Sequence, residues 1–320
     1  MLHLPNDCPS TAATLAEALP ATGPARIVAA IAQALPALAA RLAAGKLPGD
    51  PAAIAGTNES GDAQKALDLG AHDHLLAALS TASVRHMLSE EAEAVERLDP
   101  EGGWDVAIDP IDGSGSIGIG APLGLLFAIY PAGRGDFLRP GSEAVAAGYA
   151  SFGHSLDVGF TLGDGVQIAT WDGAAFRIAA SDVRLKPAAS TIAYNASNER
   201  HWPKGLQNWA RDLRLGADGP RGRDFNMRWL AAAVGELHRI LLKGGVFLYP
   251  ADRRKGYEQG RLRLAYEAVP IALLIEAAGG RATDGTRRIL DLVPQTAHEN
   301  VALVFGASEE VETIARYLAR

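Results

Sequence analysis

The residues of this chain best suited to chemistry are carboxylates that come from several separate segments. Asp109 and Asp112 follow an apolar run, and Pro110 turns the chain between them, so both carboxylates and the Ile111 carbonyl can face one point. Mg²⁺ prefers such oxygen ligands, in an octahedral shell completed by water and substrate phosphate. Two ions about 3.5–4 Å apart can stabilise the attacking and leaving oxygens of a phosphate ester. The candidate acids are Asp62, Asp68, Glu90, Glu91, Asp109, Asp112 and Glu267.

A glycine-rich turn follows the two aspartates and offers a place for a phosphate oxygen. Gly113, Ser114 and Gly115 supply backbone N–H groups and a hydroxyl directly after the acids. The stretch 113–118 also matches the G-x-G-x-x-G pattern of dinucleotide-binding folds. That fold needs a helix immediately afterwards, whereas the apolar run that follows here predicts a strand. A nicotinamide-dependent oxidoreductase is therefore disfavoured, and absence of NAD(H) binding would exclude it.

Apolar periodicity and turn residues predict the elements that position these acids. In the first sixty residues we expect one or two helices, the first ended or bent by Pro36, and then a polar loop over 56–62. Asp224 is expected to cap a helix that ends at Lys243. Further helices are expected over 66–87 and 267–278. Strands are expected over 104–108, 123–130, 146–151, 158–161, 167–171, 175–178 and 246–249, those between 146 and 178 forming an antiparallel region.

Composition limits the kinds of protein that this chain can be. Of its 320 residues, 48% are hydrophobic and 21% charged, and the formal net charge of −7 disfavours nucleic acid and anionic lipid as partners. Cys8 is the only cysteine, so an intrachain disulfide is impossible. Neither a secretory signal nor an apolar run of about 18 residues is apparent, so we expect a cytoplasmic protein without a membrane span. Two basic groups favour a small anionic substrate: Arg211, Arg214, Arg221, Arg223 and Arg228, and Arg253, Arg254, Lys255, Arg261 and Arg263.

Two other features have simpler interpretations than catalysis. Trp171-Asp172-Gly173-Ala174-Ala175 is similar to the second metal motif of inositol-monophosphatase-like enzymes, but a hairpin turn explains it fully. His238 lies in a helical apolar pattern and is expected to be a packed, hydrogen-bonded residue.

With these residues in view, the chain resembles the class I fructose-1,6-bisphosphatases over roughly residues 54–314. The resemblance implies a layered α/β (α+β) sugar-phosphatase fold, in which two sub-domains have alternating helix and sheet layers. We expect residues 1–183 to hold the metal motifs and the antiparallel region, and residues 184–320 to hold the sugar-phosphate pocket. The motifs that carry the resemblance are, in order, 61–68, Ser89-Glu90-Glu91, Asp109 to Ser114, Gly244 to Asp252, Leu262 to Glu267 and Ile289 to Pro294.

The resemblance also implies roles for individual residues. Asp62 and Asp68 match acids on a loop that closes over the metals, and Asp68 and Glu91 would position or deprotonate the attacking water. Two or more Mg²⁺ ions, with Mn²⁺ an alternative, would be held by Glu90, Asp109, the Ile111 carbonyl, Asp112 and Glu267.

The substrate implied by the resemblance is fructose 1,6-bisphosphate, hydrolysed at its 1-phosphate in gluconeogenesis or a Calvin-cycle type of metabolism. The 1-phosphate would lie on the metals, Asp112 and the turn Gly113, Ser114 and Gly115. Arg228 matches an arginine that reaches the 6-phosphate from a neighbouring subunit, so a homo-oligomer, usually a tetramer, is implied. The sugar and its 6-phosphate would be held by Asn195, Tyr249 and Arg261.

Several positions depart from the family pattern. Gly115, Ser116 and Gly118 stand in the turn that usually reads Ser-Asn-Ile-Asp, Arg261 replaces a lysine, and Trp229 replaces a tyrosine. The loop 251–260 is longer than is usual. Gly103-Trp104 replaces the Lys-Tyr pair of AMP-inhibited members and Pro131 replaces a basic residue, so inhibition by AMP is not expected.

These departures keep alternatives open. The chain could prefer sedoheptulose 1,7-bisphosphate or act on both substrates. An inositol-phosphate or nucleotide phosphatase is disfavoured by the motifs after residue 240. A non-catalytic relative would lack metal acids, and none of Glu90, Asp109, Asp112 and Glu267 is missing.

Overall fold

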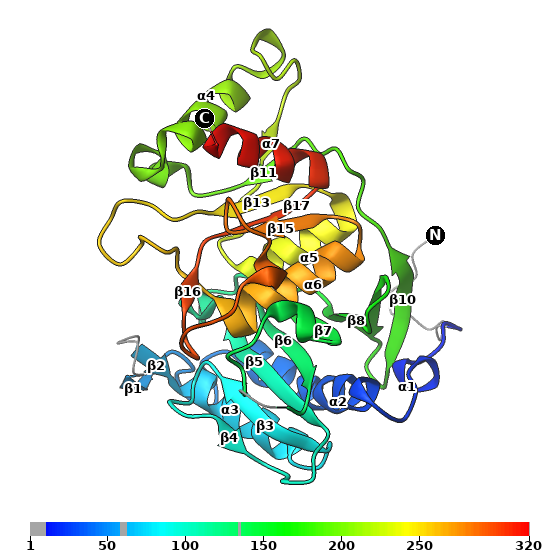
Figure 1. The fold of residues 1–320 in the computed structure, drawn as a ribbon. Helices are drawn as coiled ribbons and strands as arrows, with labels where there is room; N and C mark the ends of the chain where they lie inside the picture. Colours follow the sequence, from blue (N-terminus) through cyan, green and yellow to red (C-terminus); the bar gives the residue numbers. More distant parts are fainter. Residues whose placement is uncertain (1–10, 58–62, 134–135, 320) are drawn as a thin grey trace.

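The chain folds into five alternating layers of helix and sheet (Figure 1). This computed structural model describes residues 11–57, 63–133 and 136–319. Its two main sheets are stacked, with helices α2 and α3 outside the first, α5 and α6 between the two, and α4 and α7 outside the second. The layered α/β fold expected from the sequence is confirmed.

The first sheet has eight strands in the order β10-β9-β8-β7-β6-β5-β3-β4. Every neighbouring pair is antiparallel except β3 and β5, which run parallel. The antiparallel region with its hairpins therefore lies where the sequence predicted it. The strands are β3 (Val84–Ser89), β4 (Glu96–Arg97), β5 (Trp104–Asp112), β6 (Leu123–Pro131), β7 (Ala146–Phe152), β8 (Leu156–Thr161), β9 (Val166–Trp171) and β10 (Phe176–Val183).

The second sheet has five strands in the order β12-β11-β13-β17-β15. They are β11 (Thr191–Ala193), β12 (Asn226–Met227), β13 (Val246–Tyr249), β15 (Arg281–Thr283) and β17 (Leu303–Gly306). Two small ribbons pair β1 (Ile54–Thr57) with β2 (Ala63–Lys65) and β14 (Leu262–Arg263) with β16 (Asn300–Val301). The α-helices are α1 (Leu15–Ala18), α2 (Pro24–Ala43), α3 (Ala66–Leu79), α4 (Lys204–Arg214), α5 (Ala233–Lys243), α6 (Val269–Ala277) and α7 (Ser308–Leu318).

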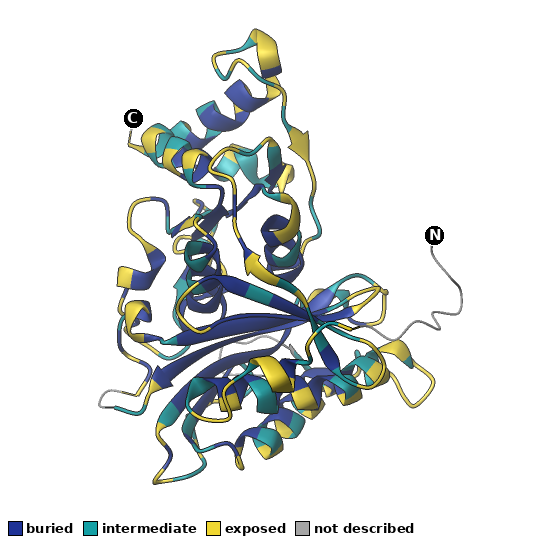
Figure 2. Ribbon diagram, turned by 90° about the vertical axis from the view of Figure 1, so that its right-hand side faces the viewer, coloured by how far each residue is buried: buried dark blue, intermediate teal, exposed yellow. Residues whose placement is uncertain are grey.

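The central strands of both sheets are buried on their two faces, which is why these strands are nearly continuous apolar runs. Along β5, Ala107 belongs to the central core, whereas Val106 and Ile108 pack toward α2 and α3. Along β13, Phe247 points into the central core and Leu248 toward α4 and α7. Figure 2 shows the buried strands between helices whose outer surfaces are exposed.

Several predicted element boundaries are wrong; among the strands, β5 extends to Asp112 and β10 to Val183, beyond the predicted 108 and 178. The helix over 66–87 ends at Leu79, because Ser83 adopts a φ of 59° and the chain then pairs with β5 as strand β3. Pro36 does not end α2, which continues to Ala43 with its apolar face buried; a bend at Pro36, the alternative, stays a prediction. Asp224 does not cap α5; its carboxylate accepts a hydrogen bond from the Ala217 amide (3.0 Å). The helix expected from Glu267 begins at Val269, after a π-helical turn.

By length and composition, one helix of the described chain, α2, could cross a membrane. Its residues Ile27, Ile31 and Leu35 are fully buried in the core that α2 shares with α3 and the first sheet. The helix is thus a core element of this fold. The central core takes residues from both halves of the chain, and the boundary at residue 183 stays a prediction.

Glu310 on α7 is a buried charge on which the outer layer depends. It is fully buried and accepts hydrogen bonds from Trp209 Nε1 (3.0 Å), Arg221 (2.9 and 2.6 Å) and Arg223 (3.2 Å). We expect Glu310→Ala to lower the free energy of unfolding by about 3–5 kcal/mol, because it leaves the largely buried Arg221 guanidinium and the buried Trp209 N–H without their partner. Urea denaturation measures this change.

Glu312→Ala is the matched control on the same helix. Glu312 forms an exposed ion pair with Arg281 (2.8 Å), and its loss should cost less than about 1 kcal/mol. Equal losses in the two variants would contradict the role given to Glu310.

Candidate active site

Three buried acids from distant parts of the sequence converge at the ends of β5 and the turn before α6. Carboxylate oxygens of Asp109, Asp112 and Glu267 all lie within 4.8 Å of one another, and each side chain is buried. They line a cavity of about 390 Å³ together with Asp68, Glu90, Glu91 and the Gly113–Gly115 turn. Such a set of oxygen donors suits a hard divalent cation.

The backbone around Pro110 explains why two acids of one strand face the same cavity. In the pairing of β5 with β6, Asp109 lies opposite Leu126 but Asp112 lies opposite Gly124, so β5 contains an extra residue at this point. Within this bulge the Ile111 amide donates to Asp109 Oδ1 (2.9 Å). The bulge breaks the alternation of side chains and turns both carboxylates to one side.

Helix α5 fixes the second aspartate. The Val234 amide, in the first turn of α5, donates to Asp112 Oδ2 (2.7 Å). The helix approaches this closely because Gly124 has no side chain; a Cβ there would lie 2.6 Å from the Val234 methyl groups. Asp112 thus lies at a helix N-terminus, where the helix dipole favours a negative charge.

Glu267 and Glu90 reach the cavity from two other elements. Glu267 lies in the π-helical turn Leu264–Ala268, a distortion that often occurs at functional sites, and accepts a hydrogen bond from the Arg263 amide. Glu90 directly follows β3, whose parallel pairing with β5 places Ser89 beside Ile108 and hence Glu90 beside Asp109. The Glu90 amide donates to the Ile108 carbonyl (3.2 Å).

Two further acids approach the same cavity. Asp68 is buried on α3; its Oδ2 accepts from the Lys65 amide (3.2 Å), while its buried Oδ1 has no hydrogen-bond partner. Glu91 accepts a hydrogen bond from Gln64 Nε2 (2.8 Å). An unsatisfied buried carboxylate oxygen beside other acids is the arrangement expected of residues that hold a cation or its water. Asp62 lies outside the described residues.

Burial and mutual repulsion raise the pKa values of these acids. Burial raises the pKa of Glu90 to about 7 and those of Asp112 and Asp68 to about 6. The pKa values of Asp109 and Glu267 also lie well above the usual range, first through burial and then through the charges of Glu90 and Asp112. A divalent cation would offset both effects, so the acid set fits such an ion.

The turn after Asp112 is held open by its backbone conformation. Gly113 has a φ of +83°, and a Cβ at this position would lie 2.8 Å from the Ala232 side chain. Ser114 begins a 3₁₀ turn (Ser114–Ser116), and the Lys65 ammonium group donates to its carbonyl oxygen. A dinucleotide-binding fold would need a helix directly after this turn, whereas in the described chain the turn leads to strand β6, as the sequence predicted.

The residues expected on the sugar side are placed at strand ends. Because Ala193 of β11 pairs with Phe247 of β13 in parallel, Asn195 and Tyr249 each lie two residues beyond this pair at neighbouring strand ends. Arg261 lines the acid cavity. Arg228 is exposed and donates to the Met227 carbonyl (2.9 Å), so within this single chain it is not part of the acid cavity.

The structure adds three residues that the sequence did not single out as part of the site. Gln64, Lys65 and Arg263 line the acid cavity. In the sequence, Arg263 belongs to a basic group and to the motif Leu262 to Glu267, and its spacing of four residues from Glu267 could have placed it near that acid. The two minor predictions hold: Asp172 caps the β9–β10 turn, accepting from the Ala174 (2.9 Å) and Ala175 (2.8 Å) amides, and His238 bonds to Tyr149 Oη (2.8 Å).

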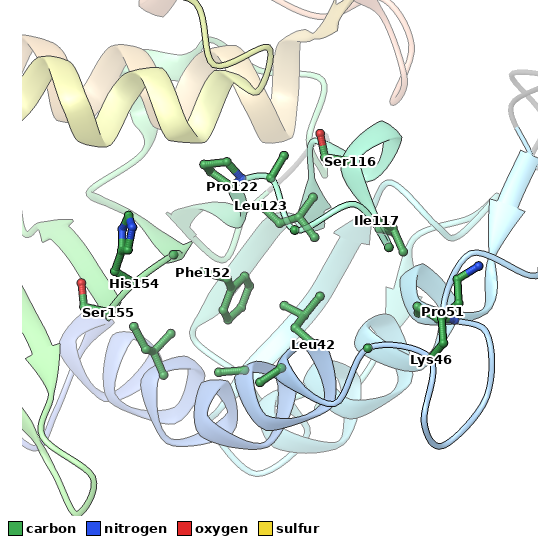
Figure 3. Close-up of a pocket in the computed structure, with 18 residues that line it drawn as sticks. Leu42, Lys46, Pro51, Ser116, Ile117, Pro122, Leu123, Phe152, His154 and Ser155 are labelled. Carbon is green, nitrogen blue, oxygen red and sulfur yellow. The ribbon is translucent and has the colours of Figure 1, made fainter.

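A larger cavity of about 720 Å³ is lined by residues between 116 and 123 and by helix α2 (Figure 3). Leu42, Leu123 and Phe152 form its apolar wall, and Lys46 and His154 lie at its edge. Among the residues that the structure describes, no carboxylate lines this cavity, so it lacks the groups that a phosphate-cleaving metal site needs. The acid cavity is therefore the better candidate despite its smaller size.

Comparison with protein-family models defines the class of the protein as a sugar phosphatase. The N-terminal domain model of fructose-1-6-bisphosphatase matches residues 25–178, and the C-terminal domain model matches residues 185–319.

Individual relatives point to one family within this class. "Fructose-1,6-bisphosphatase class 1" of Brucella anthropi is 52% identical over 286 residues, which cover 88% of this chain and 84% of the relative. The Brucella suis protein of the same name is 51% identical over the same coverage. The crystal structure of Leishmania major fructose-1,6-bisphosphatase in holo form has a TM-score of 0.90 and 26% identity, covering 97% of this chain and all of that one. The chain therefore belongs to the class 1 fructose-1,6-bisphosphatase family, which requires a divalent metal ion.

The raised pKa values predict how stability depends on pH. The folded state holds protons on Glu90 (pKa about 7) and Asp112 (pKa about 6) that the unfolded chain releases near pH 4. In EDTA, the thermal midpoint should therefore fall as pH rises from about 5 to 8. Mg²⁺ should raise the midpoint more at pH 8 than at pH 5, because protons compete for the same oxygens.

Glu90→Gln provides the control for this measurement by differential scanning calorimetry. It removes one of the titrating groups, so its midpoint should fall less over the same pH interval. An unchanged slope in this variant, or a rising midpoint in EDTA, would contradict the assignment.

Proposed function

We propose that this chain hydrolyses the 1-phosphate of fructose 1,6-bisphosphate, giving fructose 6-phosphate and phosphate, by direct attack of a metal-activated water. The observation that carries the proposal is the convergence of Asp109, Asp112 and Glu267 beside Glu90 and the unpartnered oxygen of Asp68. The family membership supports the sugar bisphosphate as substrate.

The metal ligands in this proposal are Glu90, Asp109, the Ile111 carbonyl, Asp112 and Glu267. Two or more Mg²⁺ ions, or Mn²⁺, would supply positive charge that neutralises the phosphate and lowers the pKa of a bound water. The hydrogen bonds from the Ile111, Val234 and Arg263 amides keep one oxygen of Asp109, Asp112 and Glu267, respectively, in place.

Proton transfer is assigned to Asp68 and Glu91. Asp68 has one buried oxygen free of hydrogen bonds and a pKa raised by burial to about 6, which suits a group that accepts a proton near neutral pH. Gln64 holds the Glu91 carboxylate through one of its oxygens. Asp62 keeps its predicted role as an acid of the closing loop.

Substrate contacts are assigned to both ends of the cavity. The turn Gly113, Ser114 and Gly115 would receive the 1-phosphate, and Asn195, Tyr249 and Arg261 would hold the sugar and its 6-phosphate. Because Arg228 is exposed and outside the cavity of its own chain, it is free to reach the 6-phosphate of a neighbouring subunit, which supports a homo-oligomer such as a tetramer. The cytoplasmic location stays a prediction.

Sedoheptulose 1,7-bisphosphate is a second candidate substrate. A Cβ at Gly115 would have no atom within 4 Å, so the turn leaves room beside the phosphate. Phosphate release from both bisphosphates, each measured with Mg²⁺ and with EDTA, tests the proposed activity and ranks the substrates. Absence of Mg²⁺-dependent release from either would overturn the proposal.

Asp112→Asn tests the acid cluster directly. The substitution keeps the size of the side chain but removes a charge. Loss of a residue that only orients a metal ligand lowers activity by up to about 100-fold, so loss of a ligand itself should lower Mg²⁺-dependent phosphate release by more than that. Asp164→Asn, at an exposed hairpin tip, is the control and should retain activity. Substantial activity in Asp112→Asn would remove this residue from the metal site.

AMP should have little effect on the reaction even at millimolar concentration. Trp104, at the start of β5, packs its ring into the core that α2 shares with the first sheet, and Gly103 before it has no side chain to bind a phosphate. Inhibition curves with AMP check this expectation, and strong inhibition at micromolar concentration would contradict it.

A further inference from the structure

The loop between β13 and β14 carries an aromatic side chain with two guanidinium groups against its ring. Arg254 Cζ lies 4.0 Å from the centroid of the Tyr257 ring, and Arg261 Cζ lies 5.0 Å from it. Guanidinium groups at this distance are attracted by the face of an aromatic ring. Tyr257 thus joins an arginine of the loop to an arginine of the acid cavity.

The backbone of this loop is held by its own hydrogen bonds. The Tyr257 carbonyl accepts from the Asp252 amide (2.9 Å) and the Gly260 amide (3.0 Å), and the Tyr257 amide donates to the Arg254 carbonyl (3.0 Å). The Arg253 amide donates to the His201 carbonyl (3.2 Å), which attaches the loop to the segment after Asn195. Tyr257 is therefore presented from a fixed position.

The two arginines differ in their charge partners. Arg254 is paired with the buried Asp252 carboxylate, to which its Nε donates at 3.0 Å. Among the described residues, no carboxylate forms an ion pair with Arg261, whose positive charge is held by the ring of Tyr257 alone. Arg261, rather than Arg254, is therefore the arginine that can neutralise the negative charge of a bound ligand.

Tyr257 also lies next to the sugar side of the site. Burial raises the pKa of Tyr249, and the neighbouring Tyr257 phenol raises it further, while Arg261 and Arg254 lower it. Tyr249 ends β13, and Arg261 lines the acid cavity. The ring therefore stands where the strand end, the loop and the cavity meet.

We propose that Tyr257 is a positioning residue for the distal phosphate of the substrate, because its ring holds the Arg261 guanidinium toward that phosphate. The proposal rests on the proposed bisphosphatase function and adds a residue that selects substrates with a second phosphate. Arginine fits this arrangement and lysine does not, because the planar guanidinium both stacks on a ring and binds phosphate with two hydrogen bonds. The longer loop 251–260 and Arg261 thereby act together on the distal phosphate.

Product binding in EDTA tests the proposal without metal or catalysis. Titration calorimetry should show that Tyr257→Leu weakens the binding of fructose 6-phosphate about 3- to 10-fold, the range of one ring–cation contact. Binding of fructose 1-phosphate, which lacks the distal phosphate, should not change. Tyr257→Phe keeps the ring and should restore the affinity for fructose 6-phosphate.

A double-mutant cycle keeps the test decisive if Tyr257→Leu disturbs the loop. Lysine at position 261 does not stack as arginine does, so in an Arg261→Lys background the Tyr257→Leu change should have little further effect. Additive effects, equal weakening of both sugar phosphates, or a Tyr257→Phe variant as weak as Tyr257→Leu would each overturn the proposal. In kinetics with Mg²⁺, the variant should raise KM for the bisphosphate with kcat nearly unchanged. If the unaltered protein binds fructose 6-phosphate but releases no phosphate from the bisphosphate, the proposed function alone fails.

Discussion

The structure depends on the burial of several carboxylates against one another at the end of one strand. Asp109, Asp112 and Glu267 bring three potential negative charges within 4.8 Å, and Glu90 lies beside them. Without a compensating positive charge, such a cluster destabilises the folded state, which is expressed as raised pKa values. The fold retains the cluster because backbone amides of Ile111, Val234 and Arg263 satisfy part of it. A divalent cation satisfies the rest.

The layered architecture brings the acid cluster and the residues of the sugar side together. The bulge in β5, the π-helical turn before α6 and the N-terminus of α5 meet between the two sheets, so each acid rests on a buried element. The ends of β11 and β13 in the second sheet present Asn195 and Tyr249. In the proposed function, the acid cavity and the loop between β13 and β14 would hold the two phosphate ends of the substrate. Tyr257 belongs to the end that would hold the distal phosphate, because its ring contacts the guanidinium of Arg261 and none of the acids of the cluster.

Much of this could be predicted from the sequence, and the exceptions have physical reasons. The alternation of apolar and turn residues gave the antiparallel strands and their hairpins, and the order of the acid motifs indicated the family. The boundary between α3 and β3 could not be read from periodicity, because Val84, Met87 and Leu88 continue an apolar pattern while the parallel pairing with β5 decides their conformation. Pro36 does not end α2, because burial of one face of the helix keeps the chain helical beyond the proline. The unpartnered oxygen of Asp68 depends on packing between distant segments, for which the sequence has no local signal. The contacts of the Tyr257 ring join it to Arg254 and Arg261, only three and four residues away, but an irregular loop has no periodicity from which such contacts can be predicted.

The central claim is that a divalent cation replaces protons on the buried acids. Its most direct measurement is calorimetric titration of Mg²⁺ into metal-free protein at pH 6 in two buffers with different enthalpies of ionisation. The difference between the two heats gives the number of protons released. Release of about one proton or more per chain at pH 6, and of fewer protons at pH 8, is the predicted result, since Glu90 and Asp112 have pKa values of about 7 and 6. Mg²⁺ binding with no proton release at pH 6, or no saturable binding at all, would contradict the account.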